Sequence, residues 1–443
     1  SNIIDGIRID HIDGLYDPAR YIEKLRNRYG DNVYIIAEKI LEAKEELPAT
    51  WALEGTSGYE FLSVVNQLTT DRKGARHLMQ VYQALVPELP AYKSVVIKNK
   101  TLMLEEYMGG EWNNLVRLFN QSGLGGDMDT ERIKKAIGEL MIALPVYRIY
   151  PETLPLSGND AVVMKAAFEK AMHHTRYLPE LQHLQNLFSA SNDYALQFLK
   201  RMMQFTGPLT AKGVEDTTFY VYNPLISHDE VGDSPEQLGM SVQQFHGKMK
   251  NRKHTASLSL NATTTHDTKR GEDARTRLNI LSSMSTAWET YVKKWFSVNA
   301  AYRTRIDGEV VPDANTEYFI YQAMVGGFPE DYVITAEWME RLKAYIIKAL
   351  REAKVNSNWS APHTAYEQAC LSFAEAIVQH QPFITGFIDC LQRINFYATQ
   401  QSLTQVLIKC TAPGIPDIYL PRYIASRSTG RRKHIAQLRK RRP

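Results

Sequence analysis

Cysteine is scarce in this sequence, with only Cys370, Cys390 and Cys410 among 443 residues. The three are not clustered like metal ligands, and a sparse, odd set is typical of a reducing compartment rather than of a disulfide-stabilised secreted protein. No run approaches the roughly 18 apolar residues of a membrane span, and no secretory signal begins the sequence. We therefore expect a globular, cytoplasmic protein, as 44% hydrophobic and 23% charged residues also indicate.

Acidic residues are missing from the end of the sequence, since none follows Asp417. Nine of the 52 basic residues lie there, which leaves 43 basic against 49 acidic residues in the body of the chain. Such a polybasic tail could bind nucleic acid or an anionic surface. No signature of a nucleic-acid-binding fold accompanies it, so we expect neither a nucleic-acid partner nor a membrane partner.

The first apolar stretch has the β-branched composition of a buried strand, from Ile3 and Ile4 to Ile9. Because side chains alternate across a strand, Arg8 and Asp10 point to the same side. The arginine would favour the charged form of the carboxylate. On these residues alone, a structural ion pair and a functional carboxylate both remain open.

A helix and a second strand follow this stretch. Asp17 is expected to cap a helix that begins at Pro18 and ends before Gly30. The next apolar run starts at Val33 and ends in Glu38. This is a strand–helix–strand unit that brings a second carboxylate to the same sheet edge, where barrel enzymes carry their catalytic residues.

These residues resemble a known group of proteins. Gly6-x-Arg8-x-Asp10, a Glu at the end of the next strand, and His266-Asp267 are similar to the signatures of the α-amylase clan, glycoside hydrolase family 13. The residues around these motifs are more specific than the clan signatures. They resemble the maltooligosyltrehalose synthase family at five segments, residues 6–15, 38–41, 55–59, 212–217 and 266–273. The resemblance extends from about residue 3 to residue 419.

The resemblance implies an α/β fold, a partial (β/α)8 TIM barrel of about strands 4 to 8 with large α-helical insertions. Residues 59–61 would belong to the sixth strand and 406–410 to the eighth, although the latter run could equally end a buried helix. Helical spacing predicts helices over 62–200 and 280–398. The expected divisions are 1–61 (strands 4–6), 62–255 (helical insertion), 256–279 (strand 7), 280–398 (helical insertion), 399–419 (strand 8) and 420–443 (basic tail outside the family pattern).

The resemblance also implies the site residues. Asp10 would be the nucleophile, Glu38 the general acid and base, and Asp267 the stabiliser of the transition state. The substrate-binding candidates are Arg8, His11, Tyr59, Lys212, His266 and Lys269. Two alternatives remain open. Tyr59, like Trp51, could stack on a sugar ring or pack in the interior. The Lys212 segment is expected to break the helices, and it could either bind substrate or form a surface turn. No metal and no cofactor are expected.

The implied activity is an intramolecular transglycosylation. By a retaining mechanism, the reducing-end α-1,4 linkage of a maltooligosaccharide would become α,α-1,1, a step of trehalose biosynthesis by a glucosylmutase (an isomerase). The implied partners are the glucan substrate and, in the pathway, maltooligosyltrehalose trehalohydrolase. An α-amylase-like hydrolase, a glucanotransferase and an inactive truncated remnant are the alternatives.

The sequence departs from the family at both ends. It begins at what corresponds to the fourth barrel strand, and after Tyr419 the similarity gives way to the basic tail. A closed barrel requires all its strands, because an open edge leaves backbone groups unpaired. The sequence therefore predicts a truncated or frame-shifted product.

Overall fold

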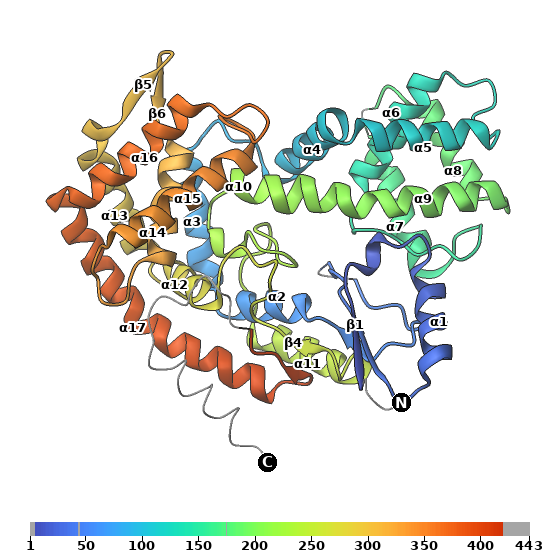
Figure 1. Cartoon of the computed structure of the whole chain (residues 1–443), viewed down its shortest axis with the longest axis horizontal. Helices are drawn as coiled ribbons and strands as arrows, with labels where there is room; N and C mark the ends of the chain where they lie inside the picture. The colour runs from blue at the N-terminus through green and yellow to red at the C-terminus, as the bar shows by residue number, and fades with distance from the viewer. Residues whose placement is uncertain (1–4, 43–44, 174, 420–443) are drawn as a thin grey trace.

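The computed structural model describes residues 5–42, 45–173 and 175–419. Ile3 and Ile4, which the sequence places in the predicted first strand, and the segment 420–443 lie outside the described residues. Most of the described chain is helical (Figure 1). The strands are β1 (Gly6–Ile9), β2 (Tyr34–Ala37), β3 (Gly55–Thr56), β4 (Leu260–Asn261), β5 (Thr304–Ile306), β6 (Glu309–Val311) and β7 (Ile415–Pro416).

The α-helices before residue 222 are α1 (Pro18–Tyr29), α2 (Tyr59–Leu68), α3 (Arg72–Leu85), α4 (Tyr92–Leu102), α5 (Gly109–Gln121), α6 (Thr130–Ala143), α7 (Gly158–Met172), α8 (Leu178–Phe188), α9 (Asp193–Thr210) and α10 (Phe219–Val221). Those that follow are α11 (Val242–Thr255), α12 (Glu272–Ser283), α13 (Ser285–Val298), α14 (Ala314–Gly327), α15 (Ala336–Ala353), α16 (Thr364–Gln379) and α17 (Gln381–Thr411).

The expected strand–helix–strand unit at the start of the chain is confirmed. β1 and β2 pair in parallel, and β2 pairs in parallel with β3. The carboxylate of Asp17 accepts the N–H of Arg20, Pro18 is the first helical residue, and Gly30 ends α1. Ile22 of this helix packs with the strand residues Ile9 and Ile35 in one apolar cluster. The helix therefore covers the sheet from which the site residues emerge.

Two further strands lie beside this sheet. β4 and β7 pair in parallel. The N–H of Thr56 in β3 donates to Oγ of Ser259, which precedes β4, at 2.8 Å. Gly58 has a φ of +93°, and a Cβ there would overlap the carbonyl oxygen of Leu260. A glycine is therefore required where the start of α2 passes β4.

Three local predictions are wrong. Residues 59–61, assigned to the sixth strand by analogy with the clan, begin α2, and the strand β3 is the shorter segment before them. Residues 406–410 lie in the last turns of α17. The run is therefore not a strand, and the alternative that it ends a helix with a buried face is confirmed, although Val406 and Leu407 themselves are exposed. Lys212 does not break the helices, because a π-helical segment, Ala211–Thr218, continues α9.

The helical insertions form two lobes with separate apolar cores (Figure 1). The α4–α9 lobe encloses a core that includes Phe119, Phe168, Phe188 and Phe198. The second lobe joins α3 with α12–α17 around the buried indoles of Trp288 and Trp295. The predicted helices over 62–200 and 280–398, and the core roles of these tryptophans, are confirmed.

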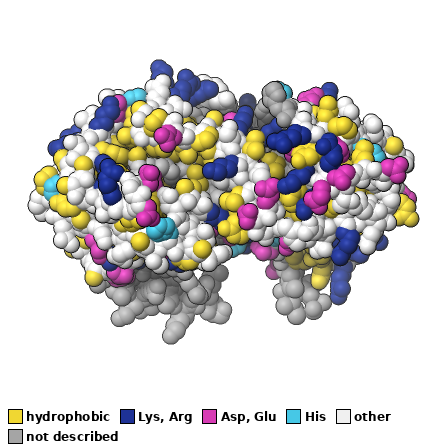
Figure 2. All heavy atoms as spheres, turned by 90° about the horizontal axis from the view of Figure 1, so that it is seen from above, with side chains coloured by type: hydrophobic (Ala, Val, Ile, Leu, Met, Phe, Trp, Pro, Cys, Tyr) yellow, Lys and Arg dark blue, Asp and Glu magenta, His cyan; other side chains and the backbone are white. Residues whose placement is uncertain are grey.

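Charges of both signs are interspersed with apolar side chains over the face seen in Figure 2.

Within the part of the chain that the structure describes, no helix combines the length and apolar character that crossing a bilayer requires.

Candidate active site

Two carboxylates leave the sheet at the ends of neighbouring parallel strands. Asp10 follows β1 directly, and Glu38 follows β2. After Asp10 the chain turns at His11, whose φ of 44° is left-handed. Its backbone N–H donates to Oε2 of Glu38 at 2.8 Å, while the N–H of Glu38 donates to the carbonyl of Ile9 at 2.7 Å. These bonds extend the strand pairing and set the two carboxylates side by side.

Arg8 lies between the two carboxylates. Its Nη2 is 3.7 Å from Oδ1 of Asp10 and 3.8 Å from Oε1 of Glu38. The side chain of Arg8 is 42% exposed and that of Asp10 is 74% exposed, whereas that of Glu38 is only 11% exposed. The arginine–aspartate pair is therefore open to solvent, which argues against a purely structural, buried ion pair.

The environment of Glu38 favours its protonated form near neutral pH. The pKa of Glu38 is raised to about 7, and burial is the largest cause. The N–H of His11 lowers it, and the neighbouring carboxyls of Asp10 and Asp267 raise it further. A carboxyl group with a pKa near 7 can donate a proton at neutral pH and take one back.

Asp267 reaches Glu38 through Tyr59. The hydroxyl of Tyr59 is 2.9 Å from Oδ2 of Asp267 and 3.3 Å from Oε1 of Glu38. It accepts a hydrogen bond from Oγ1 of Thr265 at 3.0 Å. Burial raises the pKa of Tyr59 well above its usual range, so the hydroxyl remains a donor. Nε2 of His266 lies 3.3 Å from the same Oδ2 of Asp267.

The groups converge on a small volume at the sheet edge. One ligand-type atom each of Asp10, Glu38 and His266 lies within 4.8 Å of the others. Carboxylate and imidazole groups are also ligands for divalent cations, but exposed acidic groups commonly gather without one. The expectation of no metal stays a prediction. A pair of carboxyl groups this close, one of them protonated, can act as nucleophile and acid.

Lys212 and Lys269 form a second group around Asp216. Nζ of Lys212 is 2.8 Å from Asp216, and Nζ of Lys269 is 3.6 Å from it. Burial raises the pKa of Asp216, but the two lysines outweigh burial and leave that pKa below its ordinary value. The side chain of Lys212 is 60% exposed, whereas that of Lys269 is buried. Lys212 is thus accessible to a solute and Lys269 is not.

The predicted residues therefore divide into two sets. The structure brings together Arg8, Asp10, His11, Glu38, Tyr59, His266 and Asp267, and it places Lys212 and Lys269 apart around Asp216. Tyr59 is completely buried, so its ring face does not border the open site. Trp51 packs edge to face on Tyr150 at 4.7 Å, as its packing interpretation expected.

Sequence reasoning did not find the partners that hold these groups. Thr265 bonds the Tyr59 hydroxyl, and the buried carboxylate of Glu230 accepts the backbone N–H of Lys269. Because Thr265 is adjacent to His266 in the sequence, its place near the site could have been predicted. Glu230 is far from Asp267 along the chain, and only the fold brings them together.

Comparisons with known proteins agree with this geometry. A curated protein of Mycobacterium tuberculosis described as a putative maltooligosyl trehalose synthase is 28% identical over 418 residues, which cover 94% of this chain and 52% of that protein. The chain is thus similar to maltooligosyl trehalose synthases over most of its own length. It spans about half the length of the curated relatives it matches. No protein-family model matches it.

Solved structures of such synthases share the fold. A hypothetical maltooligosyl trehalose synthase from Sulfolobus tokodaii has a TM-score of 0.78 at 31% identity, covering 95% of this chain and 52% of that one. The synthase from Arthrobacter ramosus has a TM-score of 0.82 at 27% identity, covering 96% and 52%. The family resemblance and the mostly helical α/β fold are thereby confirmed.

Proposed function

We propose that the chain carries the catalytic residues of an intramolecular transglycosylation on maltooligosaccharides, which converts the reducing-end α-1,4 linkage to α,α-1,1. The observation that carries the proposal is the pair of Asp10 and Glu38. Their carboxylate oxygens lie within 4.8 Å of each other, and the pKa of Glu38 is raised to about 7. Retaining glycosidases hold their two carboxyl groups about 5–5.5 Å apart.

The residues have the following proposed roles. Asp10 attacks the anomeric carbon and forms a covalent glycosyl intermediate, while Arg8 pairs with its carboxylate at 3.7 Å. Glu38 gives its proton to the departing glycosidic oxygen and then removes one from the incoming hydroxyl. Asp267, held by Tyr59 and contacted by His266, stabilises the positive charge of the sugar in the transition state.

The outcome depends on which hydroxyl attacks the intermediate. We propose that the released reducing-end glucose stays bound, turns, and attacks through its 1-hydroxyl. Lys212, His11 and His266 would hold the glucan, whereas the buried Lys269 would act only by holding Asp216. The names of the homologues support this acceptor over water. A maltooligosyl trehalose product is the substrate that a trehalohydrolase would take next.

We also propose that β1, β2, β3, β4 and β7 are the fourth to eighth strands of a (β/α)8 barrel. The parallel order β1–β2–β3, the parallel pair β4–β7 and the 2.8 Å bond from Thr56 to Ser259 between the two sheets support it. The domain divisions, including the basic segment 420–443, stay proposals, and so does a cytoplasmic location, which the free cysteines Cys370, Cys390 and Cys410 favour.

The test is a reducing-end assay on maltopentaose with the 443-residue chain, beside a full-length synthase. Loss of reducing ends without release of glucose identifies the mutase, and a gain identifies a hydrolase. Asp10→Asn removes the nucleophile and should abolish either change. Asp31→Asn, at an exposed carboxylate before β2, is the matched control and should leave the rate unchanged.

An unchanged number of reducing ends with the native chain, under conditions where the full-length synthase is active, would overturn the proposal. Binding of maltopentaose without turnover would then identify the chain as a sugar-binding remnant. Isothermal titration with the same sugar separates that case from a chain that does not bind glucan.

A further inference from the structure

We propose that Glu230 is a positioning residue for the reaction, and that it acts by fixing the loop that carries Asp267. This inference rests on the proposed function, because it assigns Glu230 a role at the same site. Glu230 follows the short 3-10 helical turn Ile226–His228 and is fully buried. Among the described residues its hydrogen bonds and ion pair go to residues 231, 269, 270 and 275 rather than to Asp10 or Glu38, so its effect would pass through Asp267.

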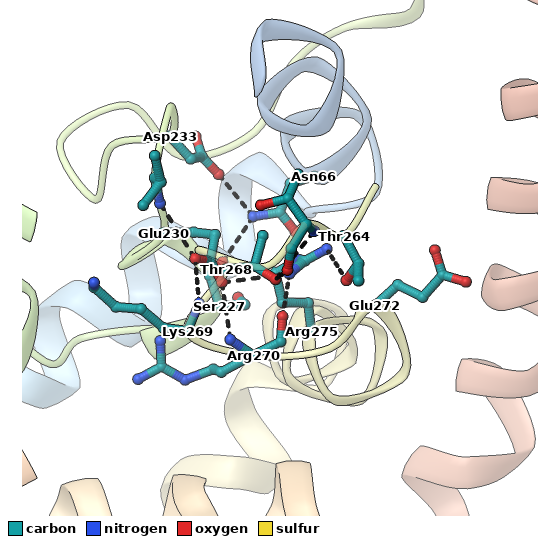
Figure 3. Close-up of polar contacts among 12 residues, drawn as sticks. Asn66, Ser227, Glu230, Asp233, Thr264, Thr268, Lys269, Arg270, Glu272 and Arg275 are labelled. Atoms are coloured by element: carbon teal, nitrogen blue, oxygen red, sulfur yellow. Dashed lines mark hydrogen bonds and ion pairs between the residues drawn. The ribbon is translucent and has the colours of Figure 1, made fainter. Parts of the chain in front are cut away.

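The carboxylate of Glu230 accepts two consecutive backbone N–H groups. Its Oε1 lies 2.6 Å from the nitrogen of Lys269, and its Oε2 lies 3.1 Å from the nitrogen of Arg270 (Figure 3). Bonds from backbone N–H groups to a carboxylate are charge-assisted and stronger than neutral ones. The loop is thus held two residues after Asp267.

Arg275 of α12 connects Glu230 with the other end of the loop. Its Nη1 lies 3.3 Å from Oε2 of Glu230. Its Nη2 donates to the carbonyl of Thr263. The same nitrogen lies 3.5 Å from Oγ1 of Thr264 (Figure 3). The segment 263–270 is therefore fixed before and after Asp267 by one carboxylate–guanidinium pair.

The segment that supplies Glu230 is anchored on α2, the helix that begins with Tyr59. Oδ2 of Asp233 accepts from Asn66 at 2.7 Å, and its Oδ1 accepts from Gln67 at 2.7 Å. Gly232 has a φ of +80°, and a Cβ there would lie 2.8 Å from the Cβ of Tyr59. The same helix thus holds Asp267 directly through Tyr59 and indirectly through Glu230.

A purely structural role would give a different result on mutation. A buried carboxylate paired with an arginine can serve folding alone, in which case its loss lowers stability and leaves the chemistry of the folded fraction intact. A residue that sets the position of Asp267 affects the transition state, since a displacement of 1 Å can cost about 100-fold in rate. The split between kcat and KM separates the two roles.

The experiment compares Glu230→Gln with Glu317→Gln in the full chain. Glu317 of α14 is also fully buried and bound to an arginine, with Nε of Arg303 at 2.6 Å, but it lies in the second helical lobe. We expect Glu230→Gln to lower kcat by about 10- to 100-fold, a loss like that seen when the partners that orient metal ligands are removed. KM should change less than about twofold. We expect the control to keep its kcat per folded molecule.

Hydrogen exchange of the peptide 264–275 provides a readout that does not depend on turnover. We expect faster exchange at Lys269 and Arg270 in Glu230→Gln and unchanged exchange there in Glu317→Gln. In an Asp267→Asn background, Glu230→Gln should lower the residual kcat by less than about twofold, because the two act as a unit. If Glu230→Gln does not fold, Arg275→Lys replaces it, since a lysine cannot bridge Glu230 and Thr263 together.

Unchanged kcat in a folded Glu230→Gln, or a loss equal to that of Glu317→Gln, overturns the proposal. If the native chain is inactive, the proposed function fails, and the exchange result alone decides this inference. Equal exchange of the peptide 264–275 in the two variants then overturns it, and faster exchange only in Glu230→Gln supports it.

Discussion

The hydroxyl of Tyr59 lies 2.9 Å from Oδ2 of Asp267, although the two residues are 208 positions apart in the chain. The same hydroxyl reaches Glu38 at 3.3 Å. One buried phenol therefore joins the carboxylates that follow β2 and β4. Its ring packs in the interior, and its polar end is the part that faces the site.

Tyr59→Phe should lower kcat by about 10- to 100-fold, because it removes a donor from Asp267 while the packing of the ring is kept. The measurement is the steady-state rate on maltopentaose. Tyr82→Phe is the matched control: Tyr82 is also buried, and its hydroxyl donates to Asn315 at 2.9 Å in the second helical lobe. Equal rates for the two variants would contradict a role of Tyr59 at the site.

The pH profile should report Glu38. Its pKa of about 7 predicts that kcat/KM falls by about tenfold per pH unit above pH 7, as the proton donor is lost. The measurement is kcat/KM from pH 5 to pH 9. A rate that stays constant up to pH 9 would show that Glu38 does not supply the proton.

Glu38 should also lower the stability of the fold at neutral pH. Its pKa is raised from 4.5 in the unfolded chain to about 7, so the folded state binds more protons between these values, and stability is lost as the pH rises through this range. Glu38→Gln should therefore raise the free energy of unfolding at pH 8 by roughly 1 to 3 kcal/mol, since one pKa unit corresponds to about 1.4 kcal/mol. At pH 4 the difference between variant and parent should vanish. Urea unfolding at the two pH values measures it.

Gly58→Ala should destabilise the fold by about 2 kcal/mol or more. Gly58 has a φ of +93°, and a Cβ would overlap the carbonyl oxygen of Leu260, so the passage of α2 beside β4 would open. Gly247→Ala is the control, because no atom lies within 4 Å of a Cβ there and the residue is inside α11. It should stabilise the protein by about 0.5–1 kcal/mol. Thermal unfolding distinguishes the two signs.

The parts of the fold that were predicted correctly depend on short-range signals. The Asp17 cap, Pro18 at the first helical position and Gly30 at the end define α1 locally. The strand error at residues 59–61 has a different origin. These residues were assigned to the sixth strand by analogy with the clan, whereas the strand ends at Thr56 and Tyr59 begins α2.

The run 406–410 shows the limit of predicting a strand from residue types. Its β-branched Val406 and Ile408 favour a strand only weakly, and they lie in the last turns of a helix of 31 residues. The strand that pairs with β4 is the two-residue β7 further on, which includes Pro416. A proline in so short a segment carries little strand signal, so the pairing partner could not be recognised from sequence.

The sequence by itself determined which chemical groups stand at the ends of the first strands and after β4, namely Asp10, Glu38 and the His266–Asp267 pair. Their proposed roles came from the resemblance of these motifs to the α-amylase clan. The tertiary structure alone decided how these groups behave. Burial and neighbouring carboxyls raise the pKa of Glu38 to about 7, and Tyr59 and Glu230 hold the Asp267 loop from distant parts of the chain. Desolvation and hydrogen bonding depend on what packs against a group in space, and those contacts are made by residues that no local pattern connects.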